Sequence, residues 1–367
     1  MAVYTPVQIV VSRDRGDRNS DVFVETLRLA FEGAADAAGS PSAYMADAVD
    51  LGIRVLEPAA DIEKSEIRAL VDGAKETVVV RIGDASAQSE ALEAIVGSDR
   101  IVPVEAPLAA SRGTTQAART GREEEAFAPV VATLRTMERA RRLLSAGVAG
   151  ARDEEQSGTL KLFISHAKTD GVAMAKSLIG VLRQLQEAHG SAPGFEYFYD
   201  AEHIEPGAVW REVLDAQARA SVLIALRTEA YESRYWCRRE FLLAESSGMP
   251  ILAVDLRKEQ YHGSAQLPFD VVPSVRVHDG NLIRVVLHAM GAHLRALRVQ
   301  SGVAARVKVL PHRPSVYSLA GAGRADVAYD KIAHPAPRVT DEYDRAVRPM
   351  LRSGMRVAKL VTFDELE

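Results

Sequence analysis

One stretch of the sequence gathers side chains that could do chemistry: residues 231–243, which read YESRYWCRREFLL. Trp236 and Glu240 are four positions apart, so a helix places the indole and the carboxylate on one face. A lone carboxylate in such a place is either a surface charge or a catalytic group. Cys237 is the only cysteine of the chain. Because no His or Asn partner for it is identifiable, we expect its thiol to pack in the core rather than act as a nucleophile.

Further polar residues stand at the ends of apolar runs that predict β-strands. Ser165 and His166 end the run LKLFISH, where they could bind a ligand or simply cap the strand. Asp200 follows FEYFY, where its carboxylate could orient the next loop through backbone amides. Arg227 follows SVLIAL. In a parallel sheet these strand ends lie at one edge, so the sequence predicts that the side chains gather there with Glu240.

The composition is that of a globular protein with room for two or three domains: 367 residues, of which 47% are hydrophobic. The net charge of −5 favours neither nucleic acid nor a membrane as the main partner. One cysteine excludes an intrachain disulfide framework and a cysteine zinc site. His288 and His293 do not share a helix face, so no metal is expected. Without a signal pattern or a run of about 18 apolar residues, we expect a cytoplasmic protein.

The middle of the chain, 160–299, alternates apolar runs with amphipathic patterns. Strands separated by helices favour a parallel sheet. Five of them predict a flavodoxin-like doubly wound α/β domain, in which ligands sit beyond the carboxyl ends of the strands. The predicted strands span 160–166, 195–199, 221–226, 250–256 and 274–278, and a closing helix spans 281–297.

The flanking regions also have α/β patterns. Residues 1–144 predict another α/β domain, and neither a Gly-rich phosphate loop nor an acid pair reveals its role. We expect a sensor, or a degenerate TIR-like or nucleotide-binding fold. The expected elements here are strands at 7–11, 78–82 and 100–104, helices at 21–35, 60–72, 87–96 and 122–144, an exposed loop at 111–122, and a linker at 145–159. Residues 300–367 predict a short α/β segment that either packs on a neighbour or is the remnant of a larger α/β unit. Its expected elements are a turn at 321–323, a helix at 340–351, and strands near 326–332 and 355–361.

Three motifs in the middle domain resemble the signature boxes of bacterial Toll/interleukin receptor (TIR) domains. They are FISH at 163–166, YDAEHIEPG at 199–207 with Trp210 after it, and YxxxxWCxxE at 231–240. The resemblance covers about 160 to 297. It implies one of two functions, because some members of this family are scaffolds that assemble through the loop after the second strand, and others are enzymes that cleave NAD.

In the NAD-cleaving members the glutamate of the WxxxE box is catalytic, and that role carries over to Glu240. Nicotinamide leaves NAD as a neutral base, so one carboxylate that stabilises the ribosyl cation can be enough. The resemblance implies substrate-binding roles for the other motif residues. Arg227 stands where many relatives carry a serine, and it could meet the pyrophosphate instead. These substrate-binding candidates are Ser165, His166, Asp200, Gly207, Trp210, Arg227, Tyr231 and Trp236.

The resemblance therefore implies an NAD glycohydrolase or cyclase that uses NAD as substrate and needs no cofactor. Relatives with extra domains imply an antiviral defence effector, active as a homo-oligomer formed through the TIR domain after a trigger ligand or partner protein arrives. Two alternatives stay open at this point. One is a non-catalytic TIR scaffold with Glu240 on its surface, and the other is a protein that binds a nucleotide signal through residues 1–144.

Overall fold

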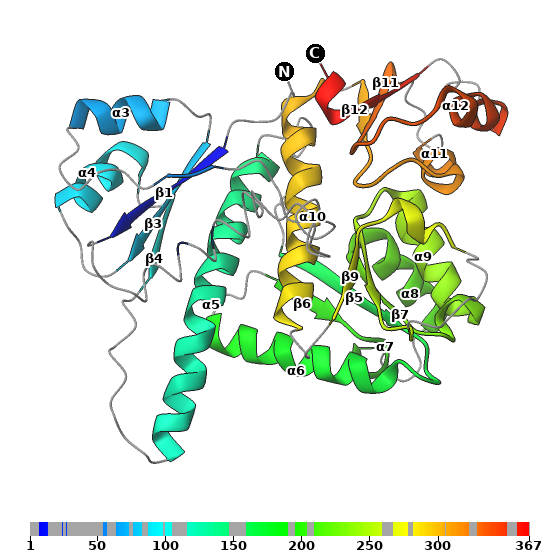
Figure 1. Cartoon of the computed structure of the whole chain (residues 1–367), viewed down its shortest axis with the longest axis horizontal. Coiled ribbons are helices and arrows are strands. Elements are labelled where there is room, and N and C mark those ends of the chain that lie inside the picture. Colours follow the sequence, from blue (N-terminus) through cyan, green and yellow to red (C-terminus); the bar gives the residue numbers. More distant parts are fainter. Residues whose placement is uncertain are drawn as a thin grey trace. The chain divides into compact units, whose positions relative to one another are not determined.

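The structure is a computed structural model (Figure 1). It divides into two compact units, one of 5–146 with 184–194 and the other of 1–4, 147–183 and 195–367, and each is described by itself. The described residues are 7–13, 24, 27, 54–56, 64–72, 76–82, 87–97, 100–104, 116–146, 159–189, 195–203, 209–258, 267–277, 282–304, 306–322, 329–350 and 358–366.

A five-stranded parallel sheet forms the centre of the second unit. Its strand order is β6-β5-β7-β8-β9, which is the flavodoxin-like order 2-1-3-4-5. The order confirms the predicted flavodoxin-like parallel sheet. The strands are β5 (Leu160–His166), β6 (Phe195–Phe198), β7 (Val222–Arg227), β8 (Ile251–Asp255) and β9 (Ser274–Arg276).

Both faces of this sheet are buried, as expected for parallel strands. One face presents Phe163, Leu223 and Ala253 to helices α8 and α9, whose Leu214 and Phe241 complete the cluster. Alternate residues of the strands are also buried, on the opposite face. The helices are α6 (Val172–His189), α7 (Asp200–His203), α8 (Trp210–Ala220), α9 (Tyr235–Ser247) and α10 (Ile283–Gly302).

A second, three-stranded parallel sheet follows α10, in the order β10-β11-β12. Figure 1 labels its strands β11 and β12. The sheet lies with helix α11 in the same compact unit as the middle domain. Helix α11 crosses α9 so closely that a Cβ on Gly321 would collide with the backbone of Ser246. The elements are β10 (Val307–Val309), α11 (Val316–Ala322), β11 (Lys331–His334), α12 (Asp341–Val347) and β12 (Lys359–Thr362).

The first unit holds a four-stranded parallel sheet in the order β2-β1-β3-β4. Its strands are rich in Val and Ile, which suits a fully buried sheet. The elements are β1 (Val7–Arg13), β2 (Arg54–Leu56), α3 (Lys64–Asp72), β3 (Glu76–Ile82), α4 (Ala87–Val96), β4 (Ile101–Val104) and α5 (Gln116–Ala146).

Two predictions about local structure were wrong. The expected loop at 111–122 is helical from Gln116, because the Ala- and Glu-rich residues beyond it continue into α5. The expected turn at 321–323 was wrong at Gly321, which is part of α11, where it allows a close helix crossing. Apart from two positions, the expected helix at 21–35 lies outside the described residues, as does nearly all of the linker. No helix among the described ranges is long and apolar enough to span a bilayer.

Candidate functional site

A chain of hydrogen bonds joins Glu240 to the carboxyl end of β5 and to the segment after β7. Ser165 Oγ lies 2.5 Å from Glu240 Oε2 and 2.7 Å from the hydroxyl of Tyr231. Ser165 is the next-to-last residue of β5, Tyr231 begins the turn Tyr231–Ser233 after β7, and Glu240 lies on α9. The structure thus brings together three of the residues that the sequence predicted for the site.

The Glu240 side chain is enclosed, and the residue is only 7% exposed. Burial raises its pKa to about 8, and the hydrogen bond from Ser165 opposes this shift. The nearby charge of Asp200 raises the pKa further, whereas Lys168 lowers it. At neutral pH the carboxyl group therefore holds its proton most of the time, as expected of a buried acid that has no direct cationic partner among the described residues.

The proton on this chain can be placed in two ways. When Glu240 is ionised, Ser165 donates to it and the Tyr231 hydroxyl donates to Ser165. When Glu240 is protonated, it can donate to Ser165, which then donates to Tyr231. Tyr231 is fully buried, and burial raises the pKa of its hydroxyl well above the usual range, so it stays protonated. The chain can thus accommodate both states of the carboxyl group.

Two tryptophans and an ion pair lie on neighbouring elements at the same edge of the sheet. The rings of Trp210 and Trp236 meet edge to face with their centroids 4.8 Å apart. Lys168 Nζ lies 5.1 Å from the centre of the Trp210 ring and 3.1 Å from Asp200 Oδ2. The other oxygen of Asp200 is buried and has no hydrogen-bond partner among the described residues. Asp200 thus keeps an open acceptor within electrostatic range of Glu240.

Sequence reasoning missed Lys168 and Asp170, which lie in the segment just after the end of β5 at His166. Asp170 accepts hydrogen bonds from Thr228 Oγ1 at 2.7 Å and from the Ala230 amide at 3.0 Å. It thereby ties the segment after β5 to the segment after β7, next to Tyr231. The signal was present, because charged residues directly after a predicted strand lie at the edge where ligands bind in such sheets.

His166 is buried at the end of β5, where its ring lies 5.2 Å from that of Tyr199. Burial lowers its pKa, whereas the charge of Asp200 raises it and that of Lys168 lowers it. The imidazole is therefore neutral at pH 7 and offers one donor and one acceptor.

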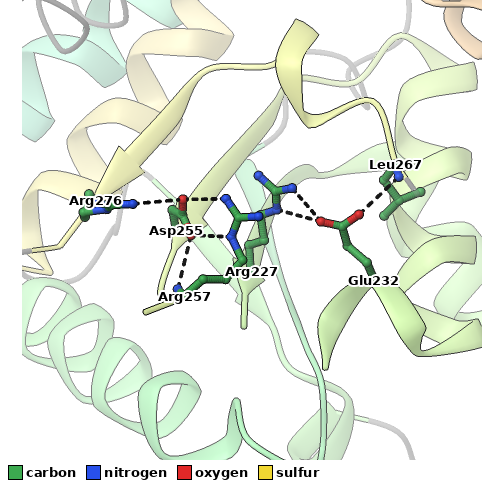
Figure 2. Close-up of polar contacts among 6 residues, drawn as sticks. All are labelled: Arg227, Glu232, Asp255, Arg257, Leu267 and Arg276. Atoms are coloured by element: carbon green, nitrogen blue, oxygen red, sulfur yellow. Dashed lines mark hydrogen bonds and ion pairs between the residues drawn. The ribbon is translucent and has the colours of Figure 1, made fainter. Parts of the chain in front are cut away.

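Arg227 is held by partners of its own (Figure 2). Its guanidinium donates two hydrogen bonds to Glu232 Oε1, at 2.9 and 2.6 Å, and covers the Phe269 ring at 4.1 Å. On the neighbouring strand Asp255 binds the side chain of Arg257 at 2.9 Å, and Arg276 lies 3.6 Å from it. These contacts explain Arg227 as a structural residue, and its role in binding substrate stays a prediction.

Cys237 packs in the core beside α9's other buried residues and is 3% exposed. Burial raises the pKa of its thiol to about 12, and the charge of Glu240 adds to this shift. A thiol that stays protonated is a poor nucleophile, in agreement with the packing role expected from the sequence. Gly207 lies outside the described residues.

No protein-family model matches this chain, and no curated protein matches it significantly. Within the described part of the chain, no group of three or more His, Cys, Asp or Glu side chains could hold a metal ion. The interpretation of the site therefore depends on its own geometry and on the three sequence motifs.

Proposed function

We propose that this protein is an NAD glycohydrolase or cyclase of the TIR type and that Glu240 is its catalytic residue. The observation that carries the proposal is the buried carboxyl of Glu240, hydrogen-bonded to Ser165 at the carboxyl end of β5. Ligands of flavodoxin-like sheets bind at this edge. A titratable group whose pKa burial shifts so far is a candidate for catalysis.

The charge of the substrate suggests how a neutral carboxyl could become active. The nicotinamide ring of NAD is a cation, and a positive charge within a few ångströms lowers the pKa of a carboxyl group. Binding of NAD would therefore release the proton of Glu240 and leave a carboxylate against the ribose. That carboxylate gains most when positive charge moves from the ring to the ribosyl carbon in the transition state.

The reaction itself balances without a general acid or a cofactor. The bond between the ribosyl carbon and the ring nitrogen breaks, and its electron pair stays on nicotinamide, which leaves neutral. Water then attacks the ribosyl cation and loses a proton, giving ADP-ribose. Alternatively, an adenine nitrogen of the same molecule attacks, giving a cyclic product.

In the cell, we propose a cytoplasmic defence effector that depletes NAD after it assembles. Two exposed apolar side chains, Val209 at 58% and Tyr235 at 57%, flank Trp210 and Trp236 and suit an assembly surface. The same surface also favours the second candidate, a non-catalytic TIR scaffold that assembles through this region. The two candidates differ in whether the assembled protein consumes NAD.

Nicotinamide release from NAD tests the proposal. Purified protein should release nicotinamide at high concentration or with a crowding agent, and Glu240→Gln should lower the rate at least 100-fold. Glu245→Gln is a matched control, because Glu245 is a second buried glutamate of α9 and its pKa is also raised, to about 7, chiefly by burial. A wild-type rate no higher than that of Glu240→Gln under all these conditions would favour the scaffold.

A further inference from the structure

A cavity of about 220 Å³ lies where α9 ends against the C-terminal three-stranded sheet. It is separate from the Glu240 site, because its walls come from the ends of α8 and α9, from β10, and from α11. Among the described residues, its lining includes two cations and no carboxylate. The polar side chains in the lining are Arg219, Ser246, Ser247, Lys308, Ser318 and Tyr329.

Lys308 occupies an unusual place for a lysine. It lies on edge strand β10 opposite Ile332 of β11, which in turn pairs with Leu360 of β12. Ile332 and Leu360 belong to the apolar cluster on that face of the sheet, so the lysine stem emerges from an apolar surface. Its ammonium lies beside the end of α9, 3.7 Å from where a Cβ on Gly248 would stand.

The Lys308 ammonium has no counter-ion within the described ranges. Burial alone lowers its pKa, and neither a carboxylate nor a hydrogen bond opposes the shift. The side chain is partly buried, and a partly buried cation gains from negative charge, which either the carbonyl end of α9 or a bound anion can supply. The empty space beside it is therefore the expected place for an anion.

Arg219 faces the same cavity from the last turn of α8 and forms no salt bridge within the described structure, although the charge of Asp215 lies within electrostatic range. The acid one turn earlier, Asp215, forms its hydrogen bonds with Arg239 of α9, whose Nε donates to it at 2.7 Å. Ser318 is also occupied, because its hydroxyl exchanges hydrogen bonds with the backbone of Ser315. The hydroxyls of Ser247 and Tyr329 have no such partner in the described ranges and can turn toward the cavity.

We propose that this cavity binds a small phosphate-bearing anion between Arg219 and Lys308, with the hydroxyls of Ser247 and Tyr329 as further donors. A tetrahedral oxyanion has enough acceptor oxygens to meet donors that converge from several directions. A guanidinium and an ammonium together suit phosphate well. The ligand would link α8, α9 and β10 and so fix the C-terminal sheet on the helix that carries Glu240.

Direct binding to the full-length chain tests this site. Inorganic phosphate and pyrophosphate are titrated by calorimetry, and by the melting temperature, at constant ionic strength set with sodium chloride. We expect saturable heat and a rise in the melting temperature. Lys308→Met and Arg219→Gln should each weaken binding about tenfold or more, since each removes a charge-assisted contact. Lys359→Met is the matched control, because Lys359 is exposed on β12 of the same sheet.

The alternative is a purely structural role, in which the charge of Lys308 stabilises the carbonyl end of α9 without a ligand. In that case Lys308→Met lowers the melting temperature but binds phosphate as the wild type does, and this result would overturn the proposal. The absence of saturable binding by the wild type would overturn it as well. Arg219 is exposed, so Arg219→Gln keeps the test decisive if Lys308→Met does not fold. Glu240→Gln should bind phosphate normally, which separates this proposal from the proposed NAD cleavage.

Discussion

The hydroxyl of Ser165 lies 2.5 Å from the carboxylate of Glu240, although the two residues are 75 positions apart in the chain. This bond connects the end of β5 to α9 and leaves the carboxyl group with a neutral partner rather than a cation. The protein thus keeps a buried acid whose pKa is raised to about 8. Its free energy of unfolding should therefore depend on pH in a predictable direction.

Replacing Glu240 by Gln should stabilise the protein in alkaline solution. Below about pH 4.5 the carboxyl is protonated in both the folded and the unfolded chain, so it does not make the free energy of unfolding depend on pH. Between about pH 4.5 and 8 only the folded protein holds the proton, and stability falls as the pH rises. Each unit of pKa shift is worth about 1.4 kcal/mol. Above pH 8, Glu240→Gln should thus unfold at a clearly higher urea concentration than wild type. Its free energy of unfolding should be larger by a few kcal/mol at most.

The comparison is made by urea unfolding at pH 5, 7 and 9, and the difference between the two proteins should grow along this series. A difference that is constant with pH, or that has the opposite sign, would show that Glu240 is ionised in the folded protein at neutral pH.

Ser165→Ala should raise the pKa of Glu240 further, because the hydrogen bond from Ser165 favours the charged form. The pH range in which stability falls should extend to higher values, and any NAD cleavage should need more alkaline solution. Titration of ¹³C-labelled glutamate by NMR measures the shift directly. Ser177→Ala is the control, since Ser177 is exposed on α6 and its hydroxyl donates to the Ala173 carbonyl. An unchanged Glu240 titration in Ser165→Ala would contradict the hydrogen bond.

Gly321→Ala should destabilise the protein, because its Cβ would meet the Ser246 backbone and force α11 away from α9. Overpacking of this kind costs about 1–3 kcal/mol or more. Gly180→Ala is the matched control: Gly180 lies in α6 with nothing near its Cβ position. In a helix this change should stabilise by about 0.5–1 kcal/mol. Thermal unfolding of both variants checks the prediction, and equal effects would contradict the close crossing.

Arg227→Met should cost about 3–5 kcal/mol, because it removes the cation paired with the buried Glu232 carboxylate, which also accepts a hydrogen bond from the Leu267 amide at 3.4 Å. The double variant Arg227→Met with Glu232→Gln should lose less than the single one. Arg183→Met is the control, since the pair of Arg183 with Glu202 is exposed and should contribute little. Urea unfolding gives all three values. A small loss for Arg227→Met would mean that the other contacts of Glu232, or water, compensate for the lost ion pair.

Much of the fold followed from local pattern. Strands such as β5 and β7 are continuous apolar runs between helical patterns, which predicts a buried parallel sheet. Helix α4 spans Ala87–Val96, as predicted. The short strands β2 and β10 were missed, because three residues carry too little periodicity to stand out.

The candidate site was predictable only in part. Position at a strand end indicated Ser165. Helical spacing left Glu240 open between a surface charge and a catalytic group, and only the resemblance of the three motifs to TIR domains favoured catalysis. The sequence could not show that the two side chains touch, because that distance depends on how α9 packs on the sheet. Arg227 illustrates the same limit: its partner Glu232 is five residues away, but the pairing needs the turn after β7 and the ring of Phe269. Gly321 gave no signal beyond that of a turn, since a helix crossing is a long-range contact.

Cys237 gives this protein a single, buried site for thiol labelling. A thiol reagent has only one residue to modify, and in the folded state that thiol is covered and protonated. Labelling can proceed only during openings of α9 and its surroundings. Because the same helix carries Glu240, the rate at which Cys237 is labelled measures how often the region around the candidate site opens. Mass spectrometry can follow this labelling over time without any engineered probe.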